Sequence, residues 1–241
     1  MFKMIVLYSI VSVLFIHGSS AKVAPSYIKT CPGLKSDCLK KTIEDTLPHF
    51  AKGIPELGIA PIDPLAEDHV KLILPGGFKV ELHNGTMTGL RKCDIESVSY
   101  ANNEANMLMH CNLTIKGVYK ASGRILIVSI NGDGDAKIKI KNLKLVAKIK
   151  FQDKERDGVI YHEAKDLKIE HEYGDKVIFS LTNLFQGNPE LSEAVLQFLN
   201  QNWKQIAEEF GQPLVDRLVS IVSKIITKFF TVVPKDELFV D

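Results

Sequence analysis

Histidine and glutamate stand side by side at two places in the sequence, His162–Glu163 and His171–Glu172. Both residue types bind transition metals, and histidine also works as an acid or base near neutral pH. Neither pair has the H-E-x-x-H spacing that brings two histidines to one face of a helix for zinc. Both pairs fall in segments that alternate like strands, so we expect them on the exposed positions of a solvated face. The sequence therefore predicts no metal site and no cofactor.

A second group of candidate ligands is the acidic run Asn131-Gly132-Asp133-Gly134-Asp135. A calcium loop of the EF-hand type would also need a bidentate glutamate further along and a helix on either side. Here the run joins two apparent strands, and Asn-Gly and Asp-Gly are typical of hairpin turns. We therefore predict a turn over residues 131–135 and no calcium site.

The common catalytic signatures are missing from the sequence. It contains no Gly-x-Ser-x-Gly elbow, no P-loop and no dinucleotide-binding fingerprint. An esterase or isomerase would need a buried nucleophile or base beside a histidine of perturbed pKa, and no such constellation is visible. We predict no catalytic residues and no enzyme activity. Loss of turnover on mutating one buried histidine would revive the catalytic hypothesis.

Four cysteines are present, an even number that suits a secreted chain with disulfides. Cys31 and Cys38 close a short loop, while Cys93 and Cys111 lie symmetrically about Asn102 in a polar stretch typical of a hairpin loop. Opposite residues of a hairpin have Cβ atoms about 4.5–5.5 Å apart. A disulfide needs about 3.5–4.5 Å, so a non-hydrogen-bonded pair would suit. We predict the disulfides Cys31–Cys38 and Cys93–Cys111; zinc would need C-x-x-C spacings, which are missing.

Residues 1–21 have the pattern of a signal peptide. Lys3 supplies a basic start, Ile5 to Ile16 form an apolar core, and small residues follow up to Ala21. The alternative is a membrane anchor, but the apolar run is too short to span a bilayer, so we expect no stable membrane insertion. We predict a secreted, extracellular protein, in haemolymph or another extracellular fluid, with residues 22–241 as a single domain.

The sequence contains two sequons for N-linked glycosylation, at Asn84 and Asn112, which a secreted protein could carry modified. Asn84 falls in an apparent turn, and Asn112 falls at an outward position of an apparent strand.

Hydrophobic residues make up 45% of the chain and charged residues 24%, which is ordinary for a globular protein. The net charge of +1 gives no reason to expect a nucleic acid partner.

The elements that position these residues begin with a helix over residues 36–52, for which Ser36 or Asp37 can serve as N-cap. Pro48 should bend or end this helix. The next segment, residues 53–65, is apolar but rich in proline, which suits neither a regular helix nor a central strand. We interpret it as a loop that covers the surface. By position, this helix and loop could form a lid.

The chain from about Val70 to Leu181 alternates between apolar and polar residues, as half-buried strands do. Turns are predicted at Pro75–Gly77 and at Asp157–Gly158. The apolar parity switches at Asn142, which predicts a β-bulge, and a bulge bends a strand and raises its twist. Long strands with a bulge and one apolar face imply a strongly curved antiparallel sheet.

Two helical runs close the chain. Gly187 breaks the preceding strand, Asn188 can cap the first run, and Pro189 takes its first position. Apolar residues over 191–210 follow the stripe of one helix face. Over 214–230 the apolar surface is much wider than one face, so this run must be surrounded by protein or other apolar material.

The predicted fold class is therefore α+β: a long C-terminal α-helix wrapped by a highly curved antiparallel β-sheet, with a short N-terminal helix. This fold turns a large apolar surface inward. The interior could pack solid or leave a ligand cavity, and periodicity alone does not separate the two. A pocket lined by apolar and aromatic residues is the usual form of a small-molecule site.

Several short motifs follow one another in a fixed order over nearly the whole chain after the predicted signal peptide. They are the pair Cys31/Cys38, Lys52–Pro55 with Ile62–Leu65, Gly117–Tyr119 with Gly123, Gly132–Gly134, and Asn183–Asn188 with Phe198–Trp203. In order and spacing the chain resembles the insect takeout and haemolymph juvenile hormone binding proteins.

The resemblance implies a long helix wrapped by a curved sheet, as in tubular lipid-binding modules. It also implies an elongated internal cavity for one apolar ligand, and no catalysis. Ligand candidates in the family are juvenile hormones, other isoprenoids such as quinones, fatty acids and odorant-like lipids. Juvenile hormone binding proteins proper place their second disulfide later in the chain. No cysteine follows Cys111 here, which favours the broader takeout-like group.

We therefore predict a secreted carrier that binds a small hydrophobic ligand, namely juvenile hormone, another isoprenoid or a fatty-acid-like lipid, in an internal apolar cavity. Burial is worth about 0.8 kcal/mol per CH₂, so apolar area suffices for affinity. A polar head would need one or two directed hydrogen bonds, for which Tyr119, Tyr161 and Tyr173 are candidates. Each could instead be a strand tyrosine with its hydroxyl at the surface. The predicted ligand-binding residues are Leu126, Val128, Phe151, Tyr161, Phe179, Phe198 and Trp203.

The alternative is a secreted signalling or interaction protein that acts through a cell-surface receptor. Takeout relatives are linked to feeding, clock output and behaviour, and the interior would then be only a structural core. A purified protein that is solidly packed and free of ligand would favour this alternative.

Overall fold

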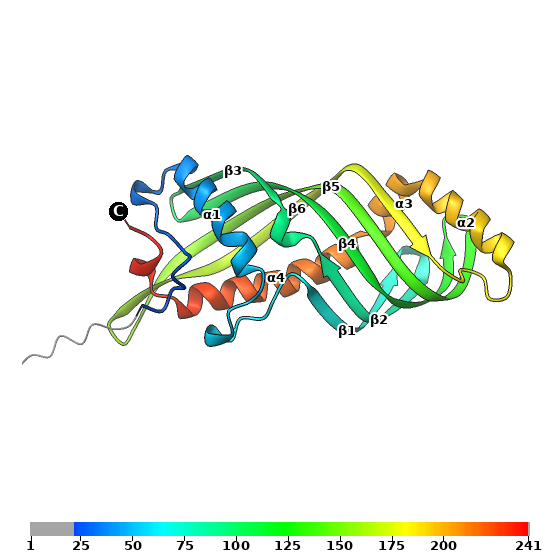
Figure 1. Ribbon diagram of the computed structural model, residues 1–241, viewed down its shortest axis with the longest axis horizontal. Coiled ribbons are helices and arrows are strands. Elements are labelled where there is room, and N and C mark those ends of the chain that lie inside the picture. The colour runs from blue at the N-terminus through cyan, green and yellow to red at the C-terminus, as the bar shows by residue number, and fades with distance from the viewer. Residues whose placement is uncertain (1–21, 241) are drawn as a thin grey trace, which may run out of the picture.

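The computed structural model describes residues 22–240. The predicted signal peptide over residues 1–21 lies outside them, as does residue 241. Figure 1 shows an elongated molecule in which long strands cross obliquely over the central helix. The start of the described chain and its C-terminal segment lie at the same end, where Glu237 accepts hydrogen bonds from the backbone N–H of Val23 at 3.1 Å and of Ala24 at 2.6 Å.

Within the described residues the strands form one antiparallel sheet of six strands in the order β1-β2-β4-β5-β6, with β3 paired to β4. Their bounds are β1 (Leu65–Leu74), β2 (Phe78–Thr88), β3 (Asp94–Ala101), β4 (Glu104–Ile125), β5 (Val128–Arg156) and β6 (Val159–Leu181). The last three contain 22, 29 and 23 residues, against about 5–6 in an average strand. Strands of this length must twist and coil, which curls the sheet into a trough.

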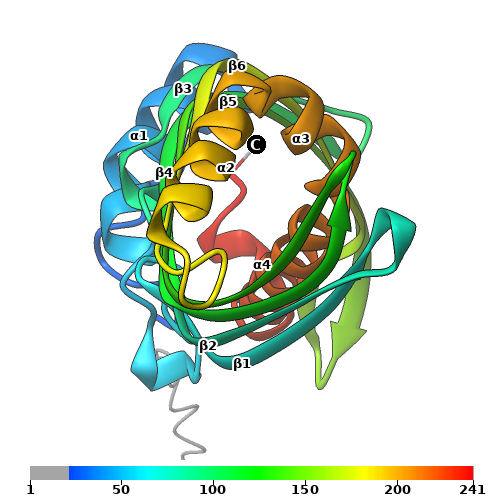
Figure 2. The same cartoon turned by 90° about the vertical axis from the view of Figure 1, so that its right-hand side faces the viewer.

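The helices are α1 (Ser36–Phe50), α2 (Pro189–Gln201), α3 (Trp203–Phe210) and α4 (Gln212–Val232), with short 3₁₀ turns at Pro32–Leu34, Pro55–Leu57, Pro75–Gly77, Leu90–Lys92 and Lys235–Glu237. Viewed along the long axis, the sheet curves around α4, and α2 and α3 lie beside β6 (Figure 2). A long C-terminal helix wrapped by a curved antiparallel sheet is the predicted fold, and it is confirmed.

The run predicted as one stripe over residues 191–210 is divided between α2 and α3. Its start is as predicted, because the Asn188 side chain accepts a hydrogen bond from the Leu191 N–H at 3.0 Å and Pro189 is the first helical residue. The break lies at Asn202, whose φ and ψ are −104° and 23°. Its side-chain amide donates to the Phe198 carbonyl at 2.9 Å, which ends α2 locally.

The predicted cap of the first helix is wrong. The N-cap position is Lys35, which makes no side-chain capping bond, and Ser36 and Asp37 already lie inside α1. The helix ends at Phe50, shortly after Pro48. The following proline-rich segment covers the end of α4, since two of its isoleucines belong to a core cluster built around that end, namely Ala24, Ile54, Ile59, Phe229 and Val233.

The chain does not turn at residues 131–135, as the sequence predicted, because these residues continue β5. The β4–β5 hairpin turns instead at Leu126–Ile127. The glycines of the run have another role: a Cβ on Gly132 would stand 2.7 Å from the carbonyl oxygen of Asn183. Glycine thus allows the segment between β6 and α2 to cross β5 at close range. Glycines required for such a crossing cannot be told from turn glycines in the sequence.

The predicted β-bulge at Asn142 is confirmed. The β4–β5 register shifts between Cys111 and Leu113, the β5–β6 register shifts between Lys141 and Leu143, and Asn142 has a φ of 53°. Its backbone N–H donates to the Asn112 side-chain oxygen at 2.9 Å. The bulge lies near the middle of β5 and helps the longest strand bend around α4.

A second bulge overturns the expected exposure of His162–Glu163. The β5–β6 register shifts again between Lys150 and Phe151, and the extra residue on β6 reverses which side chains face inward. His162 is therefore only 1% exposed and stacks on Phe151 at 4.7 Å between ring centroids, and Glu163 is 9% exposed. In the other pair, His171–Glu172, the glutamate is exposed and the histidine is half-buried.

Both predicted disulfides are confirmed. Cys31 is bonded to Cys38 and Cys93 to Cys111, with Cα–Cα distances of 5.7 and 4.4 Å. The second bond joins the residue before β3 to β4, at the end of the β3–β4 pairing opposite the hairpin turn predicted around Asn102. Predictions drawn from hairpin symmetry therefore hold for this part of the sheet.

Both sequon asparagines are exposed. Asn84 does not lie in a turn, as expected, but at an irregularity inside β2, where its φ is 49° and the register with β4 shifts between His83 and Thr86. Asn112 lies on β4 at an outward position, as expected. The bulge explains the wrong turn prediction, because Asn-Gly marks positive φ in either setting.

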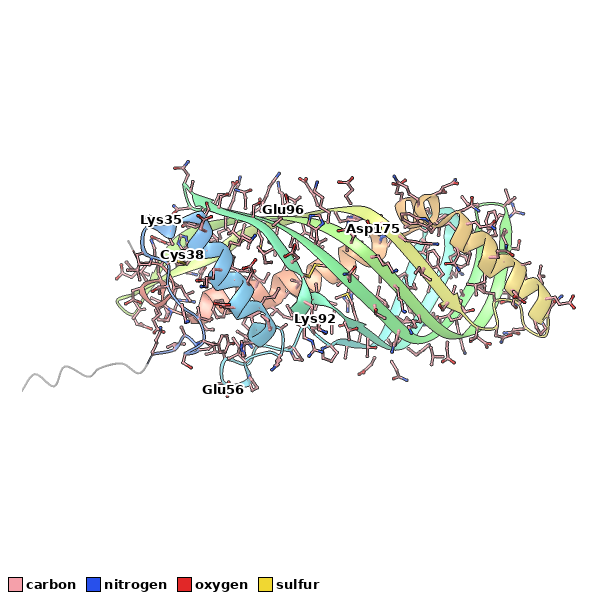
Figure 3. All side chains as sticks on the ribbon, turned by 45° about the horizontal axis from the view of Figure 1, so that its top comes forward. Lys35, Cys38, Glu56, Lys92, Glu96 and Asp175 are labelled. Carbon is pink, nitrogen blue, oxygen red and sulfur yellow. A yellow bond between two sulfur atoms is a disulfide. The ribbon has the colours of Figure 1, made fainter. Side chains whose placement is uncertain are left out.

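Charged side chains cover the outer face of the sheet, and the exposed Glu96 and Asp175 are two that Figure 3 labels. Cross-strand ion pairs on this face include Lys144–Glu172 and Lys148–Glu170, each at 3.5 Å. Exposed pairs of this kind contribute little to stability, so the face is mainly a solvated surface. Across residues 22–240, none of the helices combines the length and apolar character needed to cross a membrane.

Candidate functional site

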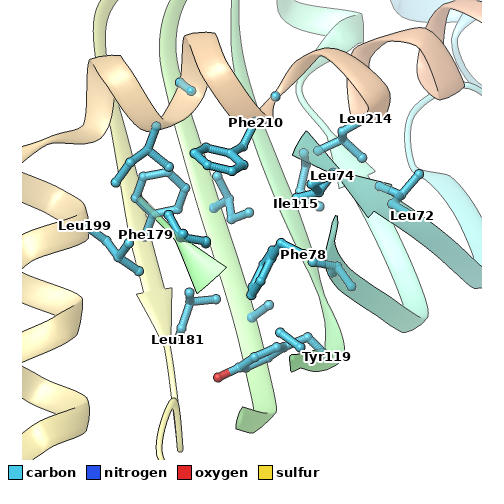
Figure 4. Close-up of a pocket in the computed structure, with 18 of the residues that line it drawn as sticks. Leu72, Leu74, Phe78, Ile115, Tyr119, Phe179, Leu181, Leu199, Phe210 and Leu214 are labelled. Carbon is cyan, nitrogen blue, oxygen red and sulfur yellow. The ribbon is translucent and has the colours of Figure 1, made fainter. Parts of the chain in front are cut away.

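The space between the sheet and the helices contains an apolar cavity of about 190 Å³, which we call the hairpin chamber (Figure 4). The inner face of the β1–β2 hairpin forms one wall, and β4, β5, β6, α2, α3 and the start of α4 form the others. The labelled side chains in Figure 4 point into this space from strands and helices alike. They are Leu72, Leu74, Phe78, Ile115, Tyr119, Phe179, Leu181, Leu199, Phe210 and Leu214.

A second cavity of about 270 Å³ lies near both ends of the described chain, and we call it the terminal chamber. Its walls are α1, the end of α4, the C-terminal segment and the paired parts of β3, β4 and β5. Aromatic and aliphatic residues again dominate, including Phe50, Met107, Phe151, Phe229, Phe230 and Phe239. Since α1 forms one wall, it lies where a lid of the terminal chamber would lie.

Both chambers suit an apolar occupant better than water. A single water needs about 10–15 Å³ of comparable volume and two to four polar partners. The chambers are many times larger than that and offer few polar groups. Filling an apolar cavity of this kind with an apolar molecule lowers the free energy, because the lining recovers dispersion contacts and buries its surface.

A packed cluster lies between the two chambers. Along β4 the lining runs from Met107 in the terminal chamber, past the cluster residue Cys111, to Tyr119 in the hairpin chamber. Along α4 the same order appears, from Phe230 through Leu218 to Leu214. The buried members of the cluster are Leu65, Met87, Cys111, Leu113, Ile115 and Leu143, and a small void of about 30 Å³ lies beside them.

Tyrosines supply the polar groups of the hairpin chamber. The Tyr119 hydroxyl donates to the Thr182 carbonyl at 2.7 Å, and burial, with a smaller effect of Asp133, raises the pKa of Tyr119 to about 12. This hydroxyl is therefore committed to the backbone. Tyr173 also lines the chamber, its pKa is raised chiefly by burial, and it forms no such bond with another described residue.

Among the residues described, one buried polar atom in the lining of the terminal chamber has no partner. The Thr46 hydroxyl on α1 is buried and makes no hydrogen bond with any residue between 22 and 240. Its neighbour one turn earlier, Thr42, contacts the Cys31 sulfur at 3.2 Å. A buried unsatisfied hydroxyl is uncommon in folded proteins, so Thr46 is a candidate for a hydrogen bond to a bound molecule.

A buried hydrogen-bond network borders the same chamber. His162 Nδ1 lies 2.5 Å from Asp153 Oδ1, and its Nε2 lies 2.6 Å from the hydroxyl of Tyr100, which lines the chamber. Burial lowers the pKa of His162, although the hydrogen bond to Asp153 opposes this shift. A neutral imidazole that donates from Nδ1 to the Asp153 carboxylate accepts a hydrogen bond from the Tyr100 hydroxyl at Nε2, so the network is internally satisfied.

The C-terminal segment holds this network in place. Lys235 donates to Asp153 Oδ2 at 2.7 Å, and this hydrogen bond is the main reason why the pKa of Asp153 lies below its usual value. Phe239 packs against His162 with ring centroids 4.7 Å apart and against Tyr100 at 5.5 Å. The last described residues therefore close the end of the terminal chamber.

The network contains a buried histidine beside a hydroxyl, the combination that a catalytic site would need. The sequence alone did not reveal this pair. The chemistry of these groups favours a structural role, the positioning of Tyr100, over catalysis. Burial, followed by the charge of Asp153, raises the pKa of Tyr100, so the phenol stays protonated and is a poor nucleophile. The arrangement can orient Tyr100 as a fixed polar group at the edge of an apolar cavity.

The predicted ligand-binding residues are divided between different places. Phe179 lines the hairpin chamber, and Leu126, Val128 and Phe198 pack against the cluster that surrounds it. Phe151 lines the terminal chamber at the other end.

The other two predicted residues lie elsewhere. The guanidinium of Arg156 stands over the Tyr161 ring at 3.9 Å, and neither Tyr161 nor Trp203 is among the residues that line the chambers. Sequence reasoning also missed Thr46 and Tyr100. Thr46 carries no sequence signal, because it interrupts the apolar face of its helix, whereas Tyr100 could have been found as the aromatic residue next to the predicted hairpin loop.

Comparison with known proteins gives consistent matches. Residues 8–240 match the family model described as haemolymph juvenile hormone binding protein. The circadian clock-controlled protein daywake of Drosophila melanogaster is 25% identical over 229 residues, which cover 89% of this chain and 88% of that protein. Its counterpart in Drosophila yakuba is 26% identical over 230 residues, with the same coverage of 89% and 88%. The crystal structure of Takeout 1 from Epiphyas postvittana superposes with a TM-score of 0.84 at 34% identity, covering 88% of this chain and 99% of that one.

Proposed function

Since the chain belongs to the haemolymph juvenile hormone binding protein family, we propose that it is a secreted carrier that holds a small hydrophobic ligand inside the curled sheet. Proteins of this family generally bind hydrophobic ligands and are binding proteins rather than enzymes. The observation that supports the proposal most strongly is the pair of large, apolar chambers on either side of the packed cluster.

The ligand class follows from the lining. A chain or ring system with few polar atoms fits walls made almost entirely of aliphatic and aromatic side chains. We propose an isoprenoid, juvenile hormone among them, or a fatty-acid-like lipid. The residues proposed to contact it are those that line the chambers, Phe151 and Phe179 among them, together with Leu126, Val128 and Phe198, which pack beside the hairpin chamber. Tyr161 and Trp203 line neither chamber and stay predictions from the sequence alone.

Secretion is part of the proposal. It rests on the signal-peptide pattern of residues 1–21 and on the two disulfides, which form and persist in oxidising compartments. Residues 22–241 would then be the mature protein, a single domain. Glycosylation at Asn84 and Asn112 is compatible with the exposure of both side chains.

A role in daily behaviour is a second proposal, and it rests on a different observation. The daywake proteins, which resemble the chain over most of its length, are named as circadian clock-controlled. We infer that the abundance of this protein also varies over the day, which transcript measurements over a light–dark cycle would test. A cell-surface receptor that recognises the loaded carrier would fit this role.

The carrier proposal is tested by uptake of a probe. The purified protein is stripped of lipid and titrated with a fluorescent fatty acid, and the bound probe is then displaced with unlabelled isoprenoids, quinones and fatty acids. We expect saturable uptake and displacement by at least one of these classes. A matched control is Ile73→Ser, which changes a side chain that is 73% exposed on the outer face of β1 and should leave uptake unchanged. Absence of saturable uptake across the panel would mean that the interior is only a core.

A further inference from the structure

The outer face of the β1–β2 hairpin carries a cluster of metal-binding side chains. His69 on β1 is the direct cross-strand partner of His83 on β2, and Glu81 lies two residues before His83 on the same face. One ligand atom from each of the three lies within 4.8 Å of the others. We propose that His69, Glu81 and His83 form a binding site for a divalent transition metal ion of the zinc and copper class.

The distances are close to those of a metal site. Glu81 Oε2 lies 3.3 Å from His69 Nε2 and 3.7 Å from His83 Nε2. Zinc binds nitrogen and oxygen ligands at about 2.0–2.2 Å, so two ligand atoms at a tetrahedral angle stand about 3.3–3.5 Å apart. Small side-chain rotations would therefore bring these three atoms around one ion. Two imidazoles and one carboxylate suit zinc or copper and leave a further position for water.

The backbone register already holds the ligands close together. The two imidazole rings are stacked, with centroids 4.4 Å apart and planes inclined by 12°, so they must tilt for both Nε2 lone pairs to point at one ion. The side chains of His69, Glu81 and His83 are 42%, 36% and 38% exposed, so an ion can reach them from solvent. The antiparallel register fixes the backbone positions of all three residues, so only their side-chain rotamers have to be ordered on binding.

One neighbouring cation opposes metal binding. Lys71 Nζ lies 3.1 Å from Glu81 Oε1, the carboxylate oxygen that does not face the histidines. The ammonium group would repel a divalent ion and compete for the carboxylate. Removing the charge of Lys71 should therefore raise the affinity of the site for a divalent ion, which is a second way to test the proposal.

The ion would also clamp the edge of the sheet. β1 is the edge strand and is hydrogen-bonded to β2 alone among the described strands. The opposite face of the same hairpin, with Val70, Leu72, Val80 and Leu82, forms a wall of the hairpin chamber. A metal ion that joins His69 to the two ligands on β2 would stabilise this wall from outside.

The test is calorimetric titration of tag-free protein with Zn²⁺ and Cu²⁺, with Mg²⁺ as a hard-ion control. We expect one equivalent of Zn²⁺ to bind, Cu²⁺ to bind more tightly, and Mg²⁺ to give no signal. His69→Gln and His83→Gln should each weaken Zn²⁺ binding roughly tenfold or more, as loss of a ligand should cost at least as much as loss of its supporting partner. The matched control is His110→Gln, since His110 is also a strand histidine beside a carboxylate, Glu96, at 2.8 Å.

Lys71→Met tests the site in the opposite direction from the histidine variants, and circular dichroism establishes that each variant is folded, because an unfolded chain with several histidines also binds Zn²⁺. We expect this variant to show higher Zn²⁺ affinity than the wild type. The proposal is overturned if Zn²⁺ does not bind saturably, or if His69→Gln and His83→Gln bind it as tightly as the His110→Gln control.

Discussion

Polar atoms are scarce inside the molecule, so each one has a large effect on which ligand fits. In the terminal chamber the Thr46 hydroxyl is buried without a partner among the described residues, while the hydroxyl of Tyr100 is engaged with His162. A buried hydroxyl without a partner costs about 1–3 kcal/mol. A ligand oxygen that reaches Thr46 would remove this cost, so the polar end of a ligand should lie against α1.

Replacing Thr46 tests that orientation. Thr46→Val keeps the shape of the side chain and removes the hydroxyl, so affinity for a ligand with a polar end should fall about two- to tenfold, the value of one net hydrogen bond. Affinity for a pure hydrocarbon should not change, and titrations with both ligands measure the difference. The control is Thr42→Val in the same helix, whose hydroxyl already contacts Cys31. An equal loss for both ligands with Thr46→Val would contradict the assignment.

His162 should make stability depend on pH. Because burial lowers the folded-state pKa of His162, the unfolded chain, with a pKa of about 6.5, binds the proton more readily. The stability associated with neutral His162 is present above that unfolded value and is lost as the pH falls from there through the folded pKa. Denaturant unfolding between about pH 8 and pH 5 should show this loss. His162→Gln should reduce the slope.

Two other histidines serve as references for this experiment. Burial also lowers the pKa of His171, so His171→Gln should reduce the slope as well. For His110 the hydrogen bond to Glu96 raises the pKa, so this residue contributes stability below the unfolded pKa and loses it as the pH rises. His110→Gln should therefore steepen the loss of stability on acidification. A His162→Gln variant with the wild-type slope would show that His162 does not titrate as its burial implies.

At the scale of elements, symmetry about a turn was the most productive sequence signal. The symmetric positions of Cys93 and Cys111 about Asn102 predict a disulfide between them, and the bond is present. The same reasoning about the Pro75–Gly77 turn would have placed His69 opposite His83, as the register does. That pair could have been predicted from the sequence alone.

Bulges and close approaches were harder to predict. The register shift beside Phe151 has no sequence signature, because apolar residues are present on both sides of it, and so the inward position of His162 was missed. Gly132 was assigned to a turn because glycine serves both turns and tight crossings. Which of these applies depends on the segment that passes over it, and that segment lies far along the chain.

The proline-rich segment depends on one buried carboxylate. Asp63 is 2% exposed and accepts hydrogen bonds from the N–H groups of Gly89 at 3.0 Å and Arg91 at 2.9 Å. Asp63→Ala would leave both donors without their acceptor, so the free energy of unfolding should fall by about 2–4 kcal/mol. Denaturant titration measures this, with Asp68→Ala, an exposed position on β1, as the control. Equal effects of the two substitutions would show that Asp63 does not fasten the segment.

At the scale of the whole molecule, the sequence predicted an inward apolar surface and a helix wrapped by a sheet, but not whether the interior was empty. Cavity volume depends on small differences in the summed size of many side chains, which periodicity does not encode. The structure shows two chambers separated by the cluster around Cys111. One ligand could therefore occupy either chamber, or span both if the cluster moves.

A matched pair of substitutions on β5 distinguishes the chambers. Ala136 lines the hairpin chamber and Ala147 the terminal chamber, with exposures of 8% and 4%. Ala136→Phe and Ala147→Phe each place a ring into one chamber and leave the other open. Overpacking costs about 1–3 kcal/mol, so circular dichroism should confirm that both variants fold.

The most direct measurement of the central claim is native mass spectrometry of the protein secreted from insect cells, followed by extraction and identification of any bound lipid. For the wild type we expect a stoichiometric apolar adduct that survives purification, and for one of the two alanine variants we expect that adduct to be lost while the other keeps it. A wild-type mass without adduct, combined with no uptake from isoprenoids and fatty acids, would contradict the carrier function and leave the interior as a structural core.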